Sequence, residues 1–425
     1  MTDTHRDEDG GHRHPELLLP AGSMPVLKTA VRYGAGAVYI GGEAFSLRAG
    51  AKNFSPEAMA EAIDFAHAHG VKVHVTANIF AHDRDIREAA AYFRELNELK
   101  PDAVLVADPG MFRLAMRHCP DVEKHISTQA NNTNAETCLF WKELGAARVV
   151  TARELSLKEI AGIRAAVGDS LEIEAFVHGA MCISYSGRCL LSSFFTGRDA
   201  NHGACAHPCR WQYAVMEMTR PGEYLPVEET ERGTYIFNSR DLCMVNHLPD
   251  LYAAGIDSFK VEGRMKTALY VATVGRTYRA AMDDYEKDPA LYEARLPWYE
   301  AQIGEGTYRD FTTGFFYGRP DETAQIYNRN TYLKTATYLG CVEEVSGGDR
   351  ICLSQKNKFS TGEMIEFMKP DGTDVRAVVR SIRGEDGQER DSAPHPGERI
   401  EVSLELADGG VPETGDIIRR RETAG

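Results

Sequence analysis

The sequence predicts a parallel (β/α)8 barrel of the TIM type, in a regular or distorted form, followed by a small C-terminal all-β barrel. From Glu16 onward, short β-branched apolar runs alternate with amphipathic helical segments. The runs are continuously apolar, which is typical of parallel strands buried on both faces. After about residue 330 the pattern changes to short strands separated by turns such as Pro370-Asp371-Gly372, which favours a small β domain.

Eight apolar runs supply the expected barrel strands. They lie at residues 17–20, 37–40, 73–78, 103–107, 125–129, 148–151, 173–178 and 258–262. Eight strand–helix units close a barrel. An open, doubly wound sheet is the alternative, but Pro20-Ala21-Gly22 after the first strand is not the glycine-rich phosphate turn of that fold.

The helices between the strands carry start and stop signals. Ser55-Pro56 places a capping residue before a proline at the first helical position, and Gly70 closes that helix. Ser156 and Glu159 have the spacing of a capping box. The last barrel helix is expected at residues 265–286. A ninth candidate strand, residues 235–238, is assigned to an insertion.

We therefore expect four parts. They are a disordered tail at 1–15, a barrel at 16–290 with a cysteine-rich insertion at 179–257, a connecting segment at 291–332, and a β-barrel domain at 333–425. The strands of the β domain are expected at 335–344, 350–353, 364–368, 375–382 and 400–406. Residues 383–397 are polar and are expected to form a loop.

Composition limits the function classes. The 425 residues include 48 basic and 63 acidic side chains, a net charge of −15, which argues against wide nonspecific nucleic-acid binding but leaves room for a local basic patch. No apolar run approaches the roughly 20 residues of a membrane span. The polar N-terminus lacks the apolar core of an export signal, so we expect a cytoplasmic protein that contacts no membrane. In that reducing compartment the nine cysteines are expected to be thiols or ligands.

Four cysteines form the strongest chemical signal. Cys182, Cys189, Cys205 and Cys209 have the spacing C-x6-C-x15-C-x3-C and follow the seventh strand. Four thiolates can hold an iron–sulfur cluster or tetrahedral zinc, and the absence of C-x2-C knuckles favours the cluster. Unliganded buried cysteines are the third interpretation. Cys243 is an alternative fourth ligand. The remaining cysteines are assigned to packing: Cys119, Cys138, Cys341 and Cys352.

The expected carboxyl ends of the strands are polar, and this is the edge at which TIM barrels carry their active sites. These strand ends and the first two loops contribute Glu43, Arg48, Asn53, Asn78, Asp108, Gln129, Asn131, Asn132, Arg153, His178, Lys260, Glu262 and Arg264. Lys260, Glu262 and Arg264, with Arg48, could clamp a carboxylate or phosphate, or could form a salt bridge at the barrel mouth. His178 and Cys182 could form a thiol nucleophile pair, but Gly179 between them breaks helical spacing and no orienting group is evident.

Two lysines mark the expected β domain. Lys356 and Lys358 adjoin Phe359 and a turn at Gly362. Such residues could contact RNA through its phosphates and by stacking, although lysines in a turn are also ordinary surface residues.

Several motifs together resemble the peptidase U32 family, the collagenase-like peptidases. The matching stretches are Glu16-Leu-Leu-Leu-Pro-Ala-Gly22, Ala37-Val-Tyr-Ile-Gly-Gly42, Ser127-Thr-Gln129-Ala-Asn131, Glu172 through Cys189, Asn238-Ser-Arg-Asp241-Leu and Lys260-Val-Glu262-Gly-Arg264. Residues 356–362 resemble the small C-terminal β-barrel of that family. The pattern over the whole chain most resembles the branch of tRNA hydroxylation proteins, called P.

The resemblance implies prephenate-dependent formation of 5-hydroxyuridine at the wobble position of tRNA. It implies a cluster, of the 4Fe-4S type, on Cys182, Cys189, Cys205 and Cys209, with Cys243 as the alternative fourth ligand because some relatives use a cysteine there. We expect the following roles. Arg48, Arg188 and Arg264 hold the carboxylates of prephenate; Gln129, Asn131, Lys260, Lys356 and Lys358 contact substrate or tRNA; His178, Tyr185 and Glu262 are the catalytic candidates.

Other branches of that family imply other activities. Some hydroxylate ribosomal RNA or ubiquinone precursors, and the family name implies a peptidase, or hydrolase. The sequence gives a peptidase little support, because it contains no HExxH motif and no recognisable triad. A noncatalytic RNA-binding protein with a structural metal is the third class.

Overall fold

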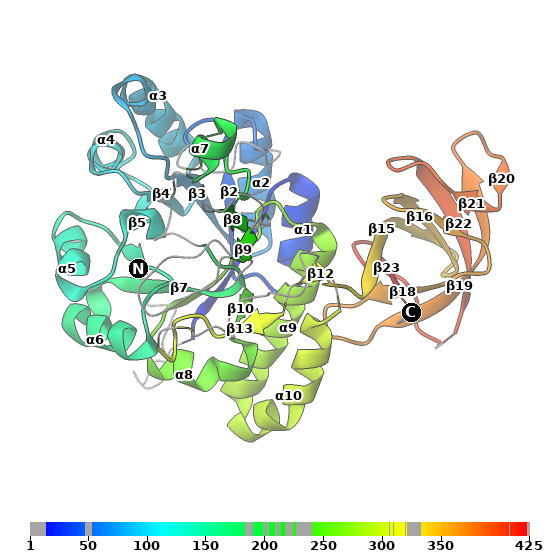
Figure 1. Cartoon of the computed structure of the whole chain (residues 1–425). Coiled ribbons are helices and arrows are strands. Elements are labelled where there is room, and N and C mark those ends of the chain that lie inside the picture. Colours follow the sequence, from blue (N-terminus) through cyan, green and yellow to red (C-terminus); the bar gives the residue numbers. More distant parts are fainter. Residues whose placement is uncertain are drawn as a thin grey trace. The chain divides into compact units, whose positions relative to one another are not determined.

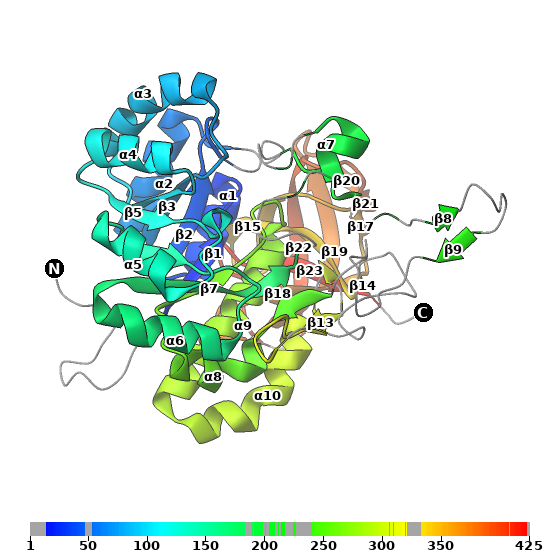
Figure 2. The ribbon, with the colours of Figure 1, turned by 60° about the vertical axis from the view of Figure 1, so that its left-hand side comes forward.

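The computed structural model describes most of the chain. The described residues are 14–46, 53–182, 189, 191–198, 200, 204–208, 211, 214–216, 224–226, 240–305, 307–308, 310–318, 320, 333–407 and 409–422. The chain divides into two compact units (Figures 1 and 2). The first comprises residues 1–27, 36–265 and 309–331, and the second comprises residues 28–35, 266–308 and 332–425.

The first unit is a closed parallel barrel of eight strands, so the predicted fold class is confirmed. Its strands are β1 (Glu16–Pro20), β2 (Ala37–Gly41), β3 (Lys72–Ala77), β4 (Ala103–Val106), β5 (Glu123–Ile126), β6 (Arg148–Val150), β7 (Glu172–Ala180) and β11 (Ser258–Val261). Parallel pairing of β11 with both β7 and β1 closes the ring.

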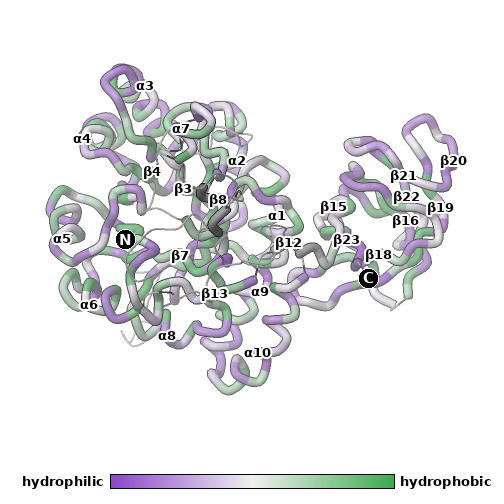
Figure 3. Tube along the Cα trace, in the orientation of Figure 1, coloured by the Kyte–Doolittle hydropathy of each residue, from purple (hydrophilic) through white to green (hydrophobic). Residues whose placement is uncertain are grey.

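Helices follow the strands along the chain. They are α1 (Met24–Arg32), α2 (Pro56–Ala68), α3 (Asp83–Leu99), α4 (Pro109–His118), α5 (Ala135–Glu143), α6 (Leu157–Val167), α7 (Leu191–Thr196) and α8 (Leu248–Ala253), with short 3-10 turns η1 (Thr128–Ala130), η2 (Gly168–Ser170) and η5 (Val245–His247). Helix α3 buries only Ala89, Phe93 and Leu96, one face at helical spacing, and much of the helix has hydrophilic colouring in Figure 3.

Both predicted helix starts are confirmed. The Ser55 side chain accepts a hydrogen bond from the backbone amide of Ala58, and Pro56 is the first helical residue of α2. Ser156 and Glu159 form a reciprocal capping box at the start of α6, with the amide of Ser156 donating to the Glu159 carboxylate at 2.7 Å. These caps satisfy amides that have no partner within their own helix.

The fifth strand is shorter than expected. The sequence predicts a strand at 125–129, but β5 ends at Ile126 and η1 follows. The Ser127 side chain accepts from the backbone amide of Gln129 at 3.4 Å, which favours a turn over an extended chain. The expected strand at 235–238 lies outside the described residues.

Four short strands are described in the first unit besides the eight barrel strands. Strand β10 (Asp241–Cys243) pairs antiparallel with β7 and parallel with β13 (Phe311–Thr312). Strands β8 (Ala214–Met216) and β9 (Tyr224–Pro226) form a separate antiparallel pair. The register of β10 places Cys243 opposite His178.

The second unit contains α9 (Ala268–Lys287), α10 (Pro289–Ile303) and a closed six-stranded antiparallel barrel. The barrel strands are β15 (Ala336–Ser346), β16 (Arg350–Ser354), β18 (Met364–Met368), β19 (Val375–Gly384), β22 (Arg399–Leu406) and β23 (Ile417–Arg421), with short strands β12 (Thr307–Tyr308), β14 (Leu333–Lys334), β17 (Phe359–Ser360), β20 (Glu389–Arg390) and β21 (Ser392–Ala393). The pairing of β18 with β19 closes this barrel, which confirms the predicted β domain.

The prediction of a loop at residues 383–397 is wrong in part. Strand β19 continues to Gly384, and β20 pairs back onto it through a turn in which the amide of Gly384 donates to the carbonyl of Gln388. The backbone of Gly387 has φ +75°, which suits glycine. Exposed edge strands carry polar residues, so their composition resembles that of a loop.

No helix among the described residues is long and apolar enough to cross a membrane.

Replacing Ser156 with alanine removes one half of the capping box of α6. We expect Ser156→Ala to lower the free energy of unfolding by about 1 kcal/mol, measured by urea denaturation. Lys158→Ala, an exposed change in the same first turn, is the control and should be nearly neutral. An equal effect of the two substitutions would contradict the capping role.

Candidate functional site

A pocket lies at the carboxyl ends of the strands of the first unit. Its lining residues come from seven of the eight barrel strands or the turns after them. They are Tyr39, Thr76, Asn78, Leu105, Ser127, Thr128, Gln129, Val150, Arg153, Phe176, Lys260, Glu262 and Arg264. This is the edge at which parallel barrels place their chemistry, because the loops that follow the strands meet there.

Arg264 is held firmly in this pocket. Its guanidinium donates to Ser46 Oγ at 2.5 Å, to Thr76 Oγ1 at 2.8 Å and to Asn53 Oδ1 at 3.2 Å, and the side chain is buried. All three acceptors are neutral, so these bonds orient the guanidinium without cancelling its charge. Gly41 makes room for it, because a Cβ there would lie 2.1 Å from the Arg264 Nη1 atom.

Two further cations border the pocket. Lys260 Nζ lies 2.6 Å from Glu174 Oε1 and 4.7 Å from the centre of the Tyr39 ring. The guanidinium of Arg153 lies 4.8 Å from the centre of the Phe176 ring and donates to the carbonyl of Ala180 at 2.8 Å. Three cationic side chains against one lining carboxylate, that of Glu262, favour an anionic ligand.

Arg148 organises an ion-pair network inside the barrel. It donates to Glu16 at 2.7 Å, to Glu172 at 2.7 Å and to Glu174 at 3.1 Å, and its side chain is 1% exposed. Burial alone would raise the pKa of Glu16, but the Arg148 guanidinium outweighs it, and the pKa of that carboxyl falls below its usual range. Burial likewise acts to raise the pKa of Glu174, and Lys260 and Arg148 together lower it.

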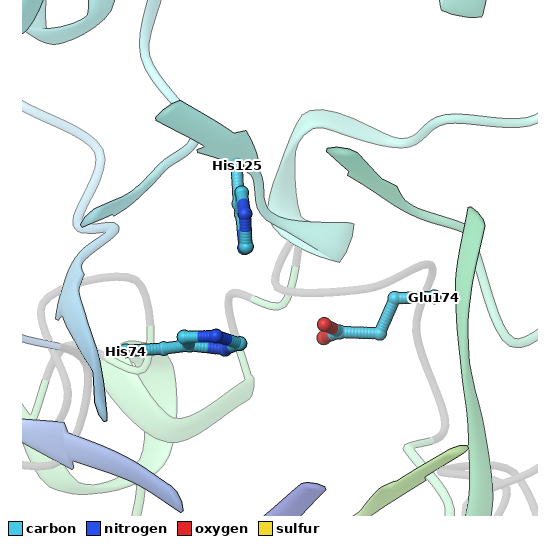
Figure 4. Close-up of side chains that lie close together, drawn as sticks. All are labelled: His74, His125 and Glu174. Carbon is cyan, nitrogen blue, oxygen red and sulfur yellow. The ribbon is translucent and has the colours of Figure 1, made fainter. Parts of the chain in front are cut away.

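Two histidines lie beside this network. His74 on β3 and His125 on β5 have ring centres 4.9 Å apart in an edge-on arrangement, and both side chains are buried. Figure 4 shows their rings and the Glu174 carboxylate directed toward one another. Burial lowers the pKa of His74 well below its ordinary value and also lowers the pKa of His125. Both imidazoles are therefore neutral at pH 7.

The predicted cysteine ligands lie beyond β7. Cys182 is exposed, Cys189 is buried, and Cys205 and Cys243 are half-buried. None of the eight cysteines that the structure describes forms a disulfide, so the available donors are thiols, the donor set that suits an iron–sulfur cluster. Cys209 lies outside the described residues, and the choice between Cys209 and Cys243 stays a prediction.

The structure brings some of the predicted site residues together. Gln129, Lys260, Glu262 and Arg264 line the pocket. His178 is buried in β7, with its ring 5.7 Å from that of Phe311, and Asn131 ends the η1 turn with φ +55°. Lys356 and Lys358 are exposed in the second unit. Three candidates lie outside the described residues: Arg48, Tyr185 and Arg188.

Sequence reasoning missed the polar interior. The side chains of His74, His125, Arg148 and Glu174 are buried, and each lies within a barrel strand. The sequence does contain a sign of these inward polar side chains. In Lys72-Val-His74-Val-Thr76, polar and apolar residues alternate, so every second side chain is polar. The apolar members of the same run, Val73 and Val75, point to the other face of the strand.

The sequence profile of peptidase family U32 matches residues 22–326, and that of the peptidase family U32 C-terminal domain matches residues 334–419. The chain belongs to peptidase family U32. The predicted resemblance is thus confirmed, and the two matches together cover the parallel barrel from its second strand onward and nearly all of the antiparallel barrel.

Named relatives align over most of the chain. The tRNA hydroxylation protein P1 of Bacillus subtilis is 39% identical over 394 residues, 92% of either chain. The tRNA hydroxylation protein P of Escherichia coli is 35% identical over 425 aligned residues, 90% of this chain and 92% of that one. A 23S rRNA 5-hydroxycytidine synthase of Escherichia coli is 36% identical over 268 residues, which span 63% of this U32 chain and 39% of that protein.

Replacing Arg148 tests the interior network. Arg148→Gln leaves Glu16 and Glu174 buried without their shared cation, and we expect a loss of about 3–5 kcal/mol in the free energy of unfolding at pH 7. Arg117→Gln, at an exposed position of α4, is the control and should be nearly neutral.

The stability that Arg148→Gln loses should depend on pH, and the direction of this dependence follows from the carboxyl pKa values. With Arg148 present, the lowered pKa of Glu16 contributes stability above its unfolded pKa of about 4.3, and this is lost as the pH falls through the folded value. Without Arg148, burial raises the carboxyl pKa values, so the folded variant binds more protons than the unfolded chain. Its deficit should shrink from pH 7 to pH 5, and a deficit independent of pH would contradict the network.

Proposed function

We propose that this protein is an enzyme that hydroxylates RNA, and specifically that it takes part in converting the wobble uridine of tRNA to 5-hydroxyuridine in the cytoplasm. The observation that carries the proposal is the alignment over about nine-tenths of the chain with two relatives named for tRNA hydroxylation. The relative named for ribosomal RNA aligns with only 63% of the chain, which favours tRNA over ribosomal RNA.

The pocket supports an anionic co-substrate. The Arg264 guanidinium is oriented in the pocket by the hydroxyls of Ser46 and Thr76, and Arg153 borders the same pocket. We propose that this co-substrate is prephenate, a small dicarboxylate, and that Arg264 holds one carboxylate, with Gln129 and Lys260 as further contacts. Arg48 and Arg188 stay predictions for the second carboxylate, and Asn131 stays a predicted substrate contact.

The cysteines support a redox group. Cys182, Cys189, Cys205 and either Cys209 or Cys243 would hold a 4Fe-4S cluster, which supplies electron transfer when it is bound. Cys243 lies on β10 opposite His178 at the end of β7, so at least this thiol lies near the polar end of the barrel. The backbone amide of His207 donates to Cys205 Sγ at 3.4 Å, and hydrogen bonds of this kind tune cluster potentials.

Proton handling is proposed for residues at the same strand ends. Glu262 lines the pocket, and its backbone amide donates to the carbonyl of His178 at 2.8 Å, which ties the ends of β11 and β7 together. His178 and Tyr185 are the other candidates. Lys356 and Lys358, exposed in the second unit, would contact the phosphates of tRNA and offset the acidic net charge locally.

Mass analysis of tRNA nucleosides tests the proposal. A strain lacking the gene, and any paralogue, should lose 5-hydroxyuridine derivatives from its tRNA, and the wild-type gene should restore them. Cys182→Ser and Arg264→Gln should each restore less than about one-tenth of the wild-type level. Cys352→Ser, at a half-buried position of the second unit, is the matched control and should restore it fully.

Two outcomes would count against this proposal. Unchanged 5-hydroxyuridine in the deletion strain, with loss of a hydroxylated base from ribosomal RNA, would assign the protein to ribosomal RNA instead. Cleavage of gelatin by the purified protein, abolished by Cys182→Ser, would favour a peptidase. Protein purified without oxygen should contain iron and sulfide, and a folded, iron-free sample would contradict the cluster.

A further inference from the structure

Three inward side chains on alternate strands converge inside the parallel barrel. His74 comes from β3, His125 from β5 and Glu174 from β7. Their relative exposures are 1%, 1% and 0%. One ligand atom from each residue lies within 4.8 Å of the other two, and Figure 4 shows the three side chains directed toward a common point.

The two imidazoles are incompletely satisfied by the described protein atoms. The Nδ1 atoms of His74 and His125 are buried, and neither has a hydrogen-bond partner among the described residues. Buried polar atoms are normally paired, so one unpaired nitrogen on each of two neighbouring imidazoles indicates an additional bound species. His125 Nε2 lies 3.3 Å from a carboxylate oxygen of Glu123, and a proton shared there leaves the lone pair on Nδ1.

The charge around the cluster permits a cation despite Arg148 and Lys260. Glu174 pairs directly with Arg148 and Lys260, and His125 pairs with Glu123. Arg148 links this group to Glu16 and Glu172, and Glu16 in turn pairs with Lys72, so the described network contains the carboxylates Glu16, Glu123, Glu172 and Glu174 and the cations Lys72, Arg148 and Lys260. Four carboxylates face three cations, which leaves one net negative charge. Glu174 Oε1 accepts from Lys260 and Oε2 from Arg148, and each oxygen of a carboxylate keeps a second lone pair.

We infer that His74, His125 and Glu174 form a binding site for one first-row divalent transition ion, Fe²⁺ or Zn²⁺, separate from the cysteines. Two neutral imidazoles and one carboxylate are a donor set that both ions use. Tetrahedral ligands at about 2.1 Å from a metal lie about 3.4 Å apart, so the three ligand atoms must close by at most about 1.4 Å on binding.

The site lies one layer of side chains below the pocket. Thr76 and Phe176, which line the pocket, follow His74 and Glu174 by two residues on the same strands and therefore face the same interior. Lys260 joins the two levels, because it lines the pocket and donates to Glu174. A metal bound to Glu174 would weaken the ion pair between that carboxylate and Lys260, and the pocket would become more cationic. This inference rests on the barrel interior and does not depend on tRNA as the substrate.

Cobalt(II) binding to the purified full-length protein tests the site. The wild type should bind one Co²⁺ equivalent whose spectrum lacks a thiolate-to-cobalt charge-transfer band. Affinity for that equivalent should fall at least tenfold in His74→Gln and in His125→Gln. His118→Gln, a change outside the cluster, and Cys182→Ser should both keep it. Competition with Zn²⁺ and, without oxygen, with Fe²⁺ then identifies the preferred ion.

Crystals of the cobalt-loaded wild type decide the matter even if the histidine variants fail to fold. An anomalous peak between the two imidazoles and Glu174 is the expected result. Density without anomalous signal would identify an ordered water and overturn the site. Equal cobalt binding by the wild type and both folded histidine variants would overturn it as well.

Discussion

The parallel barrel depends on buried carboxylates that are paired with buried cations in its interior. Arg148 is completely buried and bonds three carboxylates, one from β1 and two from β7, so a single guanidinium joins strands that lie far apart in the sequence. Aliphatic layers fill the interior of most TIM barrels. Here the lower layers are ionic, and removing one partner leaves a buried charge unpaired, which costs far more than losing a surface ion pair.

This interior also shapes the pocket above it. Lys260 is fixed between Glu174 below and the rings of Tyr39 and Phe176 at its sides, and Arg264 is fixed by hydroxyl and amide oxygens. The two cations therefore differ in character. Lys260 already shares its charge with a carboxylate, whereas the acceptors that orient Arg264 are neutral.

The second unit is stabilised by the same kind of interaction. Arg276 on α9 bonds the Asp374 carboxylate and the carbonyl of Lys369, and Arg419 on β23 bonds Glu366 and Asp374. Both arginines are buried. Asp374 thus links a helix to the small barrel within this unit, which explains why α9, although it follows the last strand of the parallel barrel, belongs to the unit that contains the β domain.

The sequence by itself determined the parallel barrel, the β domain, the helix caps and six of the pocket residues, because these depend on local periodicity and on the rule that parallel strands end at one edge. It did not reveal Arg148 or the cluster of His74, His125 and Glu174. Each of these residues lies within a short strand, where its polar side chain gives no local sign of its partners, and those partners come from strands up to 132 residues away. Only closure of the barrel brings such residues within bonding distance, so only the tertiary structure could decide that they form one network.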